Sequence, residues 1–410
     1  MYRLKQILSA LAWNIFVFCY NIVHHRDENV ILIGAWMGVK FADNSRFLFQ
    51  YLHHNKETLG IKKVVWVTRN ADVNKMLVEM GYESFLIGSP ESTFWHLRSG
   101  VHVVCNAVND IPNFHADIDT KLSFGAKKIQ LWHGVGGIKA VGNASNLAKK
   151  NNHKDNLIRK MMRKPFFENL LSQGGWREAH ILSSGVNCAN ALIAYTGCRS
   201  DRIFVSGYPR NCKCDLLLDK EREMLDHIAQ YNGCVLFLPT FRSDSSHYVH
   251  PLSNKKIRDY LVEKNILWIE KPHTADINQD AVYGESNNVC NLDSSFDVNT
   301  IYNAVSCVIT DYSSVAFDAV FHKKPLIIYA PDIEEFRHGD VGFIIDFESY
   351  FKDELSVNLP EMIKLLIEAF DSSGDYIQKR VDSYMRINEY GFDNRAIGCG
   401  QIWTDIKNLG

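Results

Sequence analysis

Apolar runs and stretches of helical period alternate along most of the chain. The apolar runs are short and end in polar or turn-forming residues; they lie at 29–36, 62–70, 101–107, 127–134, 202–211, 233–242, 266–273, 305–314 and 325–332. Between them, apolar residues recur with the period of a helix at 41–53, 72–80, 216–230, 315–322 and 361–370. Continuous apolar strands that alternate with helices predict an α/β fold, in which helices cover both faces of a parallel sheet.

The predicted elements fall into two sets, with a break near residues 200–215. A chain of 410 residues also suits two cores better than one. We therefore predict two doubly wound, Rossmann-like domains that face each other across a cleft. The predicted boundaries are 1–24 for an N-terminal apolar helix, 25–205 for the first domain, 206–373 for the second domain and 374–410 for C-terminal helices that pack back.

The N-terminal segment 3–23 differs from the rest of the chain. Arg3 and Lys5 precede a mostly apolar run that Asn14 and Asn21 interrupt. A helix that spans a membrane would be short and somewhat polar here, and no small-residue cleavage site of a signal peptide follows. We expect a helix that packs on the protein or lies in the membrane interface, with a true span as the alternative.

Composition narrows the class of protein. The formal net charge of −2 gives no general attraction to nucleic acid. The ten cysteines are scattered without the paired spacing of a zinc site. This pattern predicts reduced thiols in a cytoplasmic protein.

One stretch of the chain is strongly basic. Between residues 139 and 164 there are eight Lys or Arg residues and one acid, Asp155. A solvated helix face and a surface that binds an anionic lipid or polymer are both consistent with this pattern. The candidate membrane or acceptor patch consists of Lys149, Lys150, Lys154, Arg159, Lys160, Arg163 and Lys164.

A histidine stands at the end of the fourth apolar run, in the sequence IQLWHGVGG at 129–137. His133 can take a proton from a hydroxyl near neutral pH. Gly134 and the glycines that follow would let backbone and substrate approach closely. Their spacing is not that of a dinucleotide-binding motif. A structural histidine beside a tight turn is the alternative.

Polar and cationic residues end the strands of the second domain. Ligands of open α/β sheets bind beyond the carboxyl ends of the strands. Ser313 and Ser314 would begin a helix, where they could hold a phosphate or simply cap the helix. Cations in such a cleft match diphosphate oxygens. The further candidates at these strand ends are Thr240, Arg242, Lys271, His273 and Asp311.

Several of these motifs resemble the CDP-glycerol glycerophosphotransferases of teichoic-acid and capsule synthesis. The resemblance runs from about 29 to 347 and includes GVKFADNSRFLFQYL, QLWHGVGGIKAVG, SGYPRN, LPTFRSD, KPH and ITDYSSVAFDAVFHKKPLIIYAPDIEEFRHGDVGFIIDFE. It implies a GT-B-like architecture, with the acceptor in the first domain and a CDP-polyol donor in the second. The implied reaction moves glycerol phosphate to an acceptor hydroxyl and releases CMP.

The resemblance also implies roles for individual residues. His133 corresponds to the general base, Arg242, His273, Ser313 and Ser314 to donor-phosphate contacts, and Asp311 and Glu335 to contributors near the phosphate or cytidine. Lys271 joins the donor site from its place at a strand end, and Gly134, Thr240 and Arg210 are further candidates. The expected partners are a CDP-polyol, a lipid-linked or polysaccharide acceptor and an anionic membrane surface, but no nucleic acid. We expect a peripheral protein on the cytoplasmic face of the membrane, without a tightly bound cofactor or metal.

The chain departs from the family pattern at three places. Thr274 follows His273 where proline is usual, Cys212 replaces an acid, and Val135-Gly136 replaces Thr-Pro. The last change lies near the acceptor. The alternatives to a glycerol-phosphate transferase are a CDP-ribitol or other polyol-phosphate transferase, a GT-B glycosyltransferase that uses a nucleotide sugar, and a non-catalytic membrane protein that binds an anionic polymer.

Overall fold

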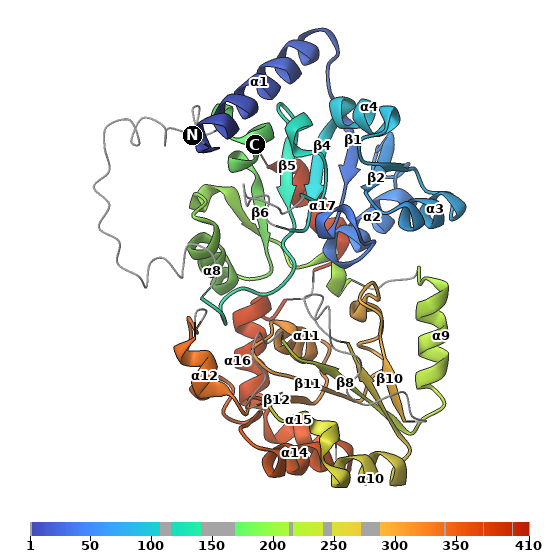
Figure 1. Cartoon of the computed structure of the whole chain (residues 1–410), viewed down its shortest axis with the longest axis vertical. Coiled ribbons are helices and arrows are strands. Elements are labelled where there is room, and N and C mark those ends of the chain that lie inside the picture. Colours follow the sequence, from blue (N-terminus) through green and yellow to red (C-terminus); the bar gives the residue numbers. More distant parts are fainter. Residues whose placement is uncertain are drawn as a thin grey trace, which may run out of the picture.

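Two parallel sheets, each flanked by helices, form the body of the protein (Figure 1). The computed structural model describes the chain except for residues 1, 107–115, 141–168, 213–215, 241–247, 272–287, 340–341, 372, 396 and 410. The predicted α/β fold with two doubly wound units is thereby confirmed. The predicted boundary at 205–206 falls between the two sheets and stays a prediction.

The first sheet has the strand order β3-β2-β1-β4-β5-β6-β7, and all neighbours are parallel. Its strands are β1 (Asp27–Ile33), β2 (Lys63–Thr68), β3 (Ser84–Leu86), β4 (Ser99–Val104), β5 (Lys127–Gln130), β6 (His180–Ser183) and β7 (Ile203–Val205). The helices and 3-10 turns of this half are η1 (Trp36–Gly38), α2 (Asp43–His54), α3 (Ala71–Glu79), α4 (Pro90–Arg98), η2 (Thr120–Leu122), η3 (Gln173–Glu178), α8 (Val186–Thr196), η4 (Ser200–Arg202) and η5 (Pro209–Asn211).

The second sheet has the order β10-β9-β8-β11-β12-β13 and is also parallel. Its strands are β8 (Gly233–Leu238), β9 (Ile266–Glu270), β10 (Val289–Asn291), β11 (Cys307–Thr310), β12 (Leu326–Tyr329) and β13 (Leu355–Ser356). The helices and turns are α9 (Asp219–Ile228), η6 (Pro251–Ser253), α10 (Lys255–Glu263), η7 (Val298–Thr300), α11 (Val315–Phe321), α12 (Ile333–His338), α13 (Phe347–Tyr350) and α14 (Leu359–Asp371). Every residue of β8 is buried, as a central parallel strand requires.

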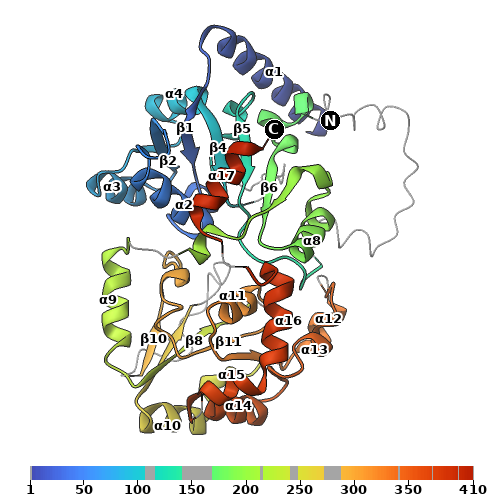
Figure 2. The same ribbon diagram turned by 180° about the vertical axis from the view of Figure 1, so that it is seen from behind.

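The C-terminal helices connect the two halves. They are α15 (Ser373–Lys379), α16 (Val381–Phe392) and α17 (Cys399–Asn408). Helix α16 packs on α11 of the second half and on α8 of the first, and α17 returns to pack on α2 (Figure 2). The C-terminal residues therefore pack back on both halves, as predicted from the sequence.

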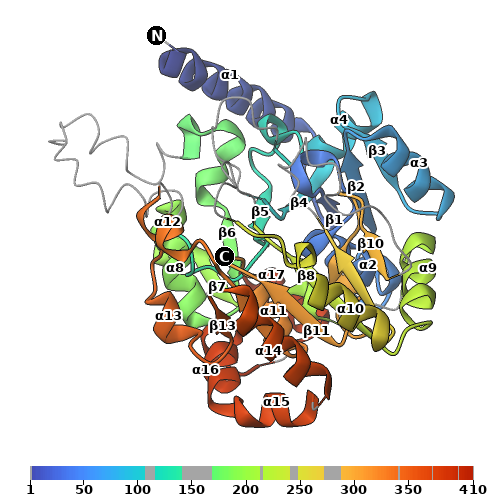
Figure 3. The ribbon, with the colours of Figure 1, turned by 60° about the horizontal axis from the view of Figure 1, so that its bottom comes forward.

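Helix α1 (Tyr2–Val23) lies on the first half, at the opposite end of the molecule from α14 and α15 (Figure 3). One side of it is docked: the Asn14 amide donates to the carbonyl oxygens of Leu170 and Ser172, both at 2.8 Å, and its oxygen accepts the N–H of Gly174 at 3.0 Å. The opposite side presents apolar side chains that are at least half exposed, namely Leu8, Ile15, Phe16, Phe18, Ile22 and Val23. Residues 5–23 are long and apolar enough to cross a membrane by length and composition alone.

Replacing the docking residue should loosen α1. Asn14→Ala removes the partner of three backbone groups, two of them buried, which costs about 1–3 kcal/mol. We expect a Tm lower by a few degrees and faster proteolysis within residues 5–23. Ser9→Ala, on an exposed position of the same helix, is the matched control and should behave as wild type. Equal stability of both variants would show that α1 docks by apolar contacts alone.

Candidate active site

A cavity of about 390 Å³ lies between the carboxyl ends of the two sheets. Residues that follow β1 and β5 line one wall, and residues that follow β8, β9 and β11 line the other. Of the predicted site residues, the cavity brings together His133, Gly134, Arg210, Thr240, Lys271, Ser313 and Ser314. The carboxyl ends of the strands in the two sheets therefore face the same cavity, as predicted from the sequence.

His133 is held tightly at the end of the turn that follows β5. The preceding residue, Trp132, has a φ of +60°, and its carbonyl accepts a hydrogen bond from the Asn44 amide at 2.8 Å. The His133 carbonyl accepts one from the Arg210 guanidinium at 2.7 Å. The imidazole packs against the rings of Trp36 and Trp132, with centroid distances of 5.6 and 5.0 Å. Its buried Nδ1 has no hydrogen-bond partner among the described residues.

The glycines after His133 permit close contact with other parts of the chain. A Cβ on Gly134 would stand only 2.5 Å from the Ser314 hydroxyl oxygen, so the turn that carries His133 lies directly against the second half. Gly137 has a φ of +123°, and the Tyr390 hydroxyl occupies the place of its missing side chain. The glycine-rich sequence thus serves packing between the halves as well as access to His133.

Burial lowers the pKa of His133 below its ordinary value of 6.5. The nearby Asp43 carboxylate raises this pKa, and the Arg210 guanidinium lowers it, but burial dominates. The imidazole is therefore uncharged at neutral pH. In this state it can accept a proton.

The second half supplies hydroxyl groups and a cation. Ser313 and Ser314 lie between β11 and α11, and no side-chain cap hydrogen bond from Ser314 closes the start of that helix. Asp311 does not line the cavity; it accepts both the N–H and the hydroxyl of Thr240 and so fixes the turn after β8. Lys271 follows β9 and donates to the Phe296 carbonyl.

Lys40 adds a cation from the first half that the sequence analysis did not single out. Its ammonium donates to the Ser294 carbonyl at 2.6 Å and lies 5.4 Å from the centre of the Trp36 ring. Burial lowers the pKa of Lys40 to about 8, and Lys271 acts in the same direction. Within the described part of the chain, neither lysine has a carboxylate within 4.0 Å. Both are therefore suited to meet an anion.

Some predicted residues lie elsewhere. Glu335 is exposed on α12 and is not part of the cavity wall. Arg242, His273 and the seven residues of the basic patch lie outside the described residues. Asp117 accepts the N–H groups of Met37, Cys105 and Asn106, so it organises a loop. In the described ranges, no group of three His, Cys, Asp or Glu residues is placed to hold a metal ion.

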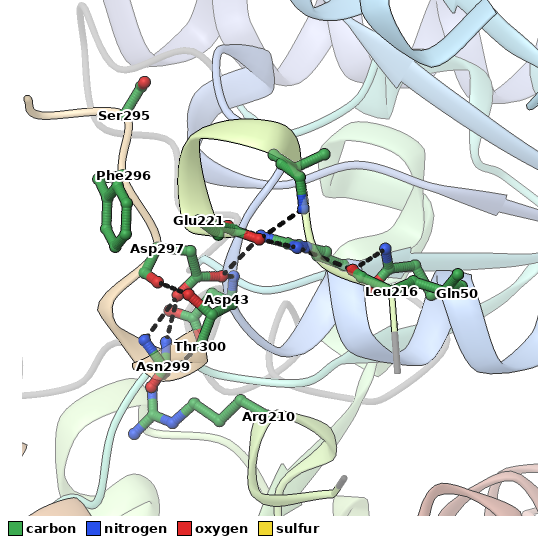
Figure 4. Close-up of polar contacts among 12 residues, drawn as sticks. Asp43, Gln50, Arg210, Leu216, Glu221, Ser295, Phe296, Asp297, Asn299 and Thr300 are labelled. Atoms are coloured by element: carbon green, nitrogen blue, oxygen red, sulfur yellow. Dashed lines mark hydrogen bonds and ion pairs between the residues drawn. The ribbon is translucent and has the colours of Figure 1, made fainter. Parts of the chain in front are cut away.

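Buried ion pairs join the two halves beside the cavity (Figure 4). Arg46 of α2 pairs with Glu221 of α9, and both side chains are fully buried. The N–H of Asp43 donates to the Asp297 carboxylate at 2.8 Å. Of these four residues only Asp43 and Asp297 line the cavity, and neither was predicted from the sequence, although Asp43 lies in the polar stretch 34–44 that follows the first strand.

A GT-B-like transferase is the class that this fold and cavity define. The solved structure of the wall teichoic acid polymerase TagF matches with a TM-score of 0.67 at 19% identity, over 99% of this chain and 98% of that chain. The sequence profile of the CDP-glycerol:poly(glycerophosphate) glycerophosphotransferase family matches residues 16–396, and the chain belongs to this family. The resemblance seen in the sequence is confirmed, and with it the enzyme class.

Curated relatives agree with this assignment. The teichoic acid poly(glycerol phosphate) polymerase of Bacillus spizizenii is 24% identical over 82% of this chain and 84% of its own length. The teichoic acid glycerol-phosphate transferase of Staphylococcus aureus is 20% identical over 88% and 89%. The ribitol-phosphate polymerase TarK of Staphylococcus aureus is 26% identical over 62% of this chain, which spans about half of that protein. These relatives are named for teichoic-acid synthesis, in keeping with the glycerophosphotransferase family to which the chain belongs.

The protonation state of His133 can be measured directly. Because burial lowers its pKa, the imidazole should titrate with a midpoint below pH 6.5 in histidine-resolved NMR. The neutral form then prevails at pH 7, and the cation appears only as the pH falls. The His133→Asn variant assigns the resonance. A midpoint above 6.5 would contradict the dominance of burial.

Proposed function

We propose that His133 is the general base that activates an acceptor hydroxyl for attack on CDP-glycerol. The hydroxyl oxygen forms a bond to the β-phosphorus, the bond from that phosphorus to the bridging oxygen breaks, and CMP leaves. The hydroxyl proton passes to His133. The observation that carries the proposal is the position of this neutral imidazole, one residue from the Gly134–Ser314 contact in a cavity shared by both halves.

The donor diphosphate would lie against the second wall of the cavity. Phosphoryl transfer needs positioning and charge stabilisation more than covalent catalysis. Lys271 and Lys40 supply positive charge, and Ser313 and Ser314 supply hydroxyl donors. The resemblance adds Arg242 and His273 to this set as proposals. In this arrangement side chains meet the diphosphate charge without a dedicated metal cage or a tightly bound cofactor.

The acceptor would enter from the first half and be a glycerol-phosphate polymer or its lipid-linked precursor. Relatives that match over more than four fifths of both chains are named for glycerol phosphate, which favours this polyol over ribitol. We place the reaction in teichoic-acid synthesis, with capsule synthesis as the alternative context. CMP release from CDP-glycerol distinguishes this function from that of a sugar transferase and from polymer binding without turnover.

Removal of the imidazole should abolish most of the activity. For His133→Ala we expect CMP release from CDP-glycerol with acceptor to fall about 10²–10⁴-fold, while the KM for the donor changes little. In wild type, kcat/KM should decline as the pH falls through the pKa of His133. His227→Ala, at the end of α9 and outside the cavity wall, is the control. Turnover near that of wild type in His133→Ala would remove this residue from the mechanism.

We also propose that α1 holds the protein on the membrane surface. Its docked side keeps it parallel to the protein, and its exposed apolar side can enter the interface between headgroups and acyl chains. The basic residues at 149–164 would add attraction to anionic lipid. This gives a peripheral protein at the cytoplasmic face of the cell membrane.

Polar substitutions on the exposed side of α1 should release the protein from membranes. Phe16, Phe18 and Ile22 are all at least half exposed, and burying each apolar side chain is worth about 1.5–3 kcal/mol. The triple serine variant should therefore bind vesicles of anionic phospholipid at least tenfold more weakly than wild type. Val262→Ser, on the distant helix α10 and 65% exposed, is the control. Unchanged vesicle binding would exclude α1 as the membrane contact.

A further inference from the structure

Arg210 contacts three parts of the cavity that come from different regions of the chain. One terminal nitrogen of its guanidinium donates to Asp43 at 3.1 Å and to the His133 carbonyl at 2.7 Å. The other donates to both carboxylate oxygens of Asp318, at 3.0 and 2.9 Å. The side chain is only 4% exposed. Arg210 thus binds the residue that carries the proposed base and a helix of the opposite half.

The backbone at His133 depends on these contacts for its conformation. Asn44 donates to the Trp132 carbonyl and accepts the N–H of Arg210 at 3.1 Å. Trp132 has a positive φ, which a residue with a large side chain rarely adopts without external support. Hydrogen bonds to the carbonyls of Trp132 and His133 supply that support. The direction in which the imidazole points therefore follows from Asn44 and Arg210.

Asp318 connects the hydrogen bond from Arg210 to the His133 carbonyl with the second half of the molecule. It lies on α11, the helix that follows Ser313 and Ser314. A Cβ on Gly134 would stand 2.5 Å from the Ser314 hydroxyl oxygen, so the start of α11 also lies against the turn that carries His133. A displacement of α11 relative to the first sheet would therefore pull on Arg210 and, through it, on the His133 carbonyl.

We propose that Arg210 is a positioning residue, which holds His133 in register with the donor side of the cavity by binding the His133 carbonyl and Asp318 at once. The inference rests on the proposed function in that it takes His133 as the base. It adds that the position of the second half determines the position of that base, because Arg210 binds both. Arg210 itself need not touch substrate in this role.

The chain offers a matched control for this proposal. Arg46 and Glu221 also form a fully buried ion pair between an element of the first half and one of the second. Arg46 donates to Glu221 and to the Leu216 carbonyl, and Glu221 accepts the N–H of Leu218, so this pair lies apart from the hydrogen bonds at the His133 carbonyl. Asp318→Asn and Glu221→Gln therefore both remove one charge of a buried pair between the halves, but only the first acts on the support of His133.

The experiment compares kcat of these two variants at a temperature where circular dichroism shows both to be folded. For Asp318→Asn we expect kcat to fall about 10²-fold, the loss typical of a base displaced by about 1 Å, with the KM for CDP-glycerol within about threefold of wild type. Glu221→Gln should keep kcat within about threefold. Wild-type kcat in Asp318→Asn, or an equal loss in Glu221→Gln, overturns the proposal. If Asp318→Asn does not fold, Arg210→Lys is measured in its place.

Two further readouts separate positioning from general destabilisation. Arg210→Ala should recover kcat about tenfold in tens of millimolar guanidinium but not in sodium chloride of equal ionic strength. The NMR resonance of the His133 ring should move in Asp318→Asn and stay in place in Glu221→Gln, and this measurement does not depend on turnover. If wild type releases no CMP from CDP-glycerol, the proposed function fails, while the NMR comparison still decides the role of Arg210.

Discussion

The position of one half of the molecule on the other depends on the ion pairs of a guanidinium, that of Arg210, which is buried between the two sheets. Removing a charge from water costs several kcal/mol, and a single partner seldom offsets that cost. Arg210 meets two carboxylates and a backbone carbonyl, and Arg46 with Glu221 repeats the arrangement nearby. Burial raises the pKa of Asp318 to about 6, and Arg210 opposes this rise. Such ion pairs are directional. They therefore define the relative position of the two halves more precisely than apolar packing would.

Half of the non-glycine residues with positive φ in the described part of the chain lie at or next to the cavity. Trp36, Met37, Asp43 and Trp132 all have positive φ, and each such residue costs about 1–3 kcal/mol. Three of these four residues are held by a hydrogen bond to a distant part of the chain: Met37 N–H to Asp117, Asp43 N–H to Asp297, and the Trp132 carbonyl to Asn44. A turn that only distant partners can stabilise will hold its side chains in one orientation. This is the condition that a base beside a cationic wall requires.

The elements that were predicted correctly are those that carry a local pattern in the sequence. The buried runs at β1, β2, β8 and β11 and the helices α2, α9 and α14 were found because each carries its own period. The strands β3, β6, β10 and β13 were missed; each has only two to four residues and so carries little pattern of its own, whereas the equally short β7 was found within the longer run 202–211. His133, Ser313 and Ser314 were recognised at strand ends.

The roles of Asp43 and Asp318 could not be predicted in this way. Arg210 meets them from 167 and 108 residues away, and no local pattern reports such a distance. Asn14 illustrates the same limit. In the sequence it interrupts an apolar helix, whereas in the structure it is the residue that docks that helix.

The placement of α1 limits how an acceptor could reach the cavity. Helix α1 lies at one end of the molecule, the second sheet lies toward the other, and the cavity lies between the sheets (Figure 1). If the exposed side of α1 rests in the membrane interface, the donor half is the part farthest from the lipid. A lipid-linked acceptor must then extend along the first half before its hydroxyl meets His133. In that arrangement the proposed base would belong to the half that the acceptor crosses, and the proposed donor half would face the aqueous side from which a soluble nucleotide would arrive. On these two proposals, the sheet that carries the proposed base would be the one nearer the membrane.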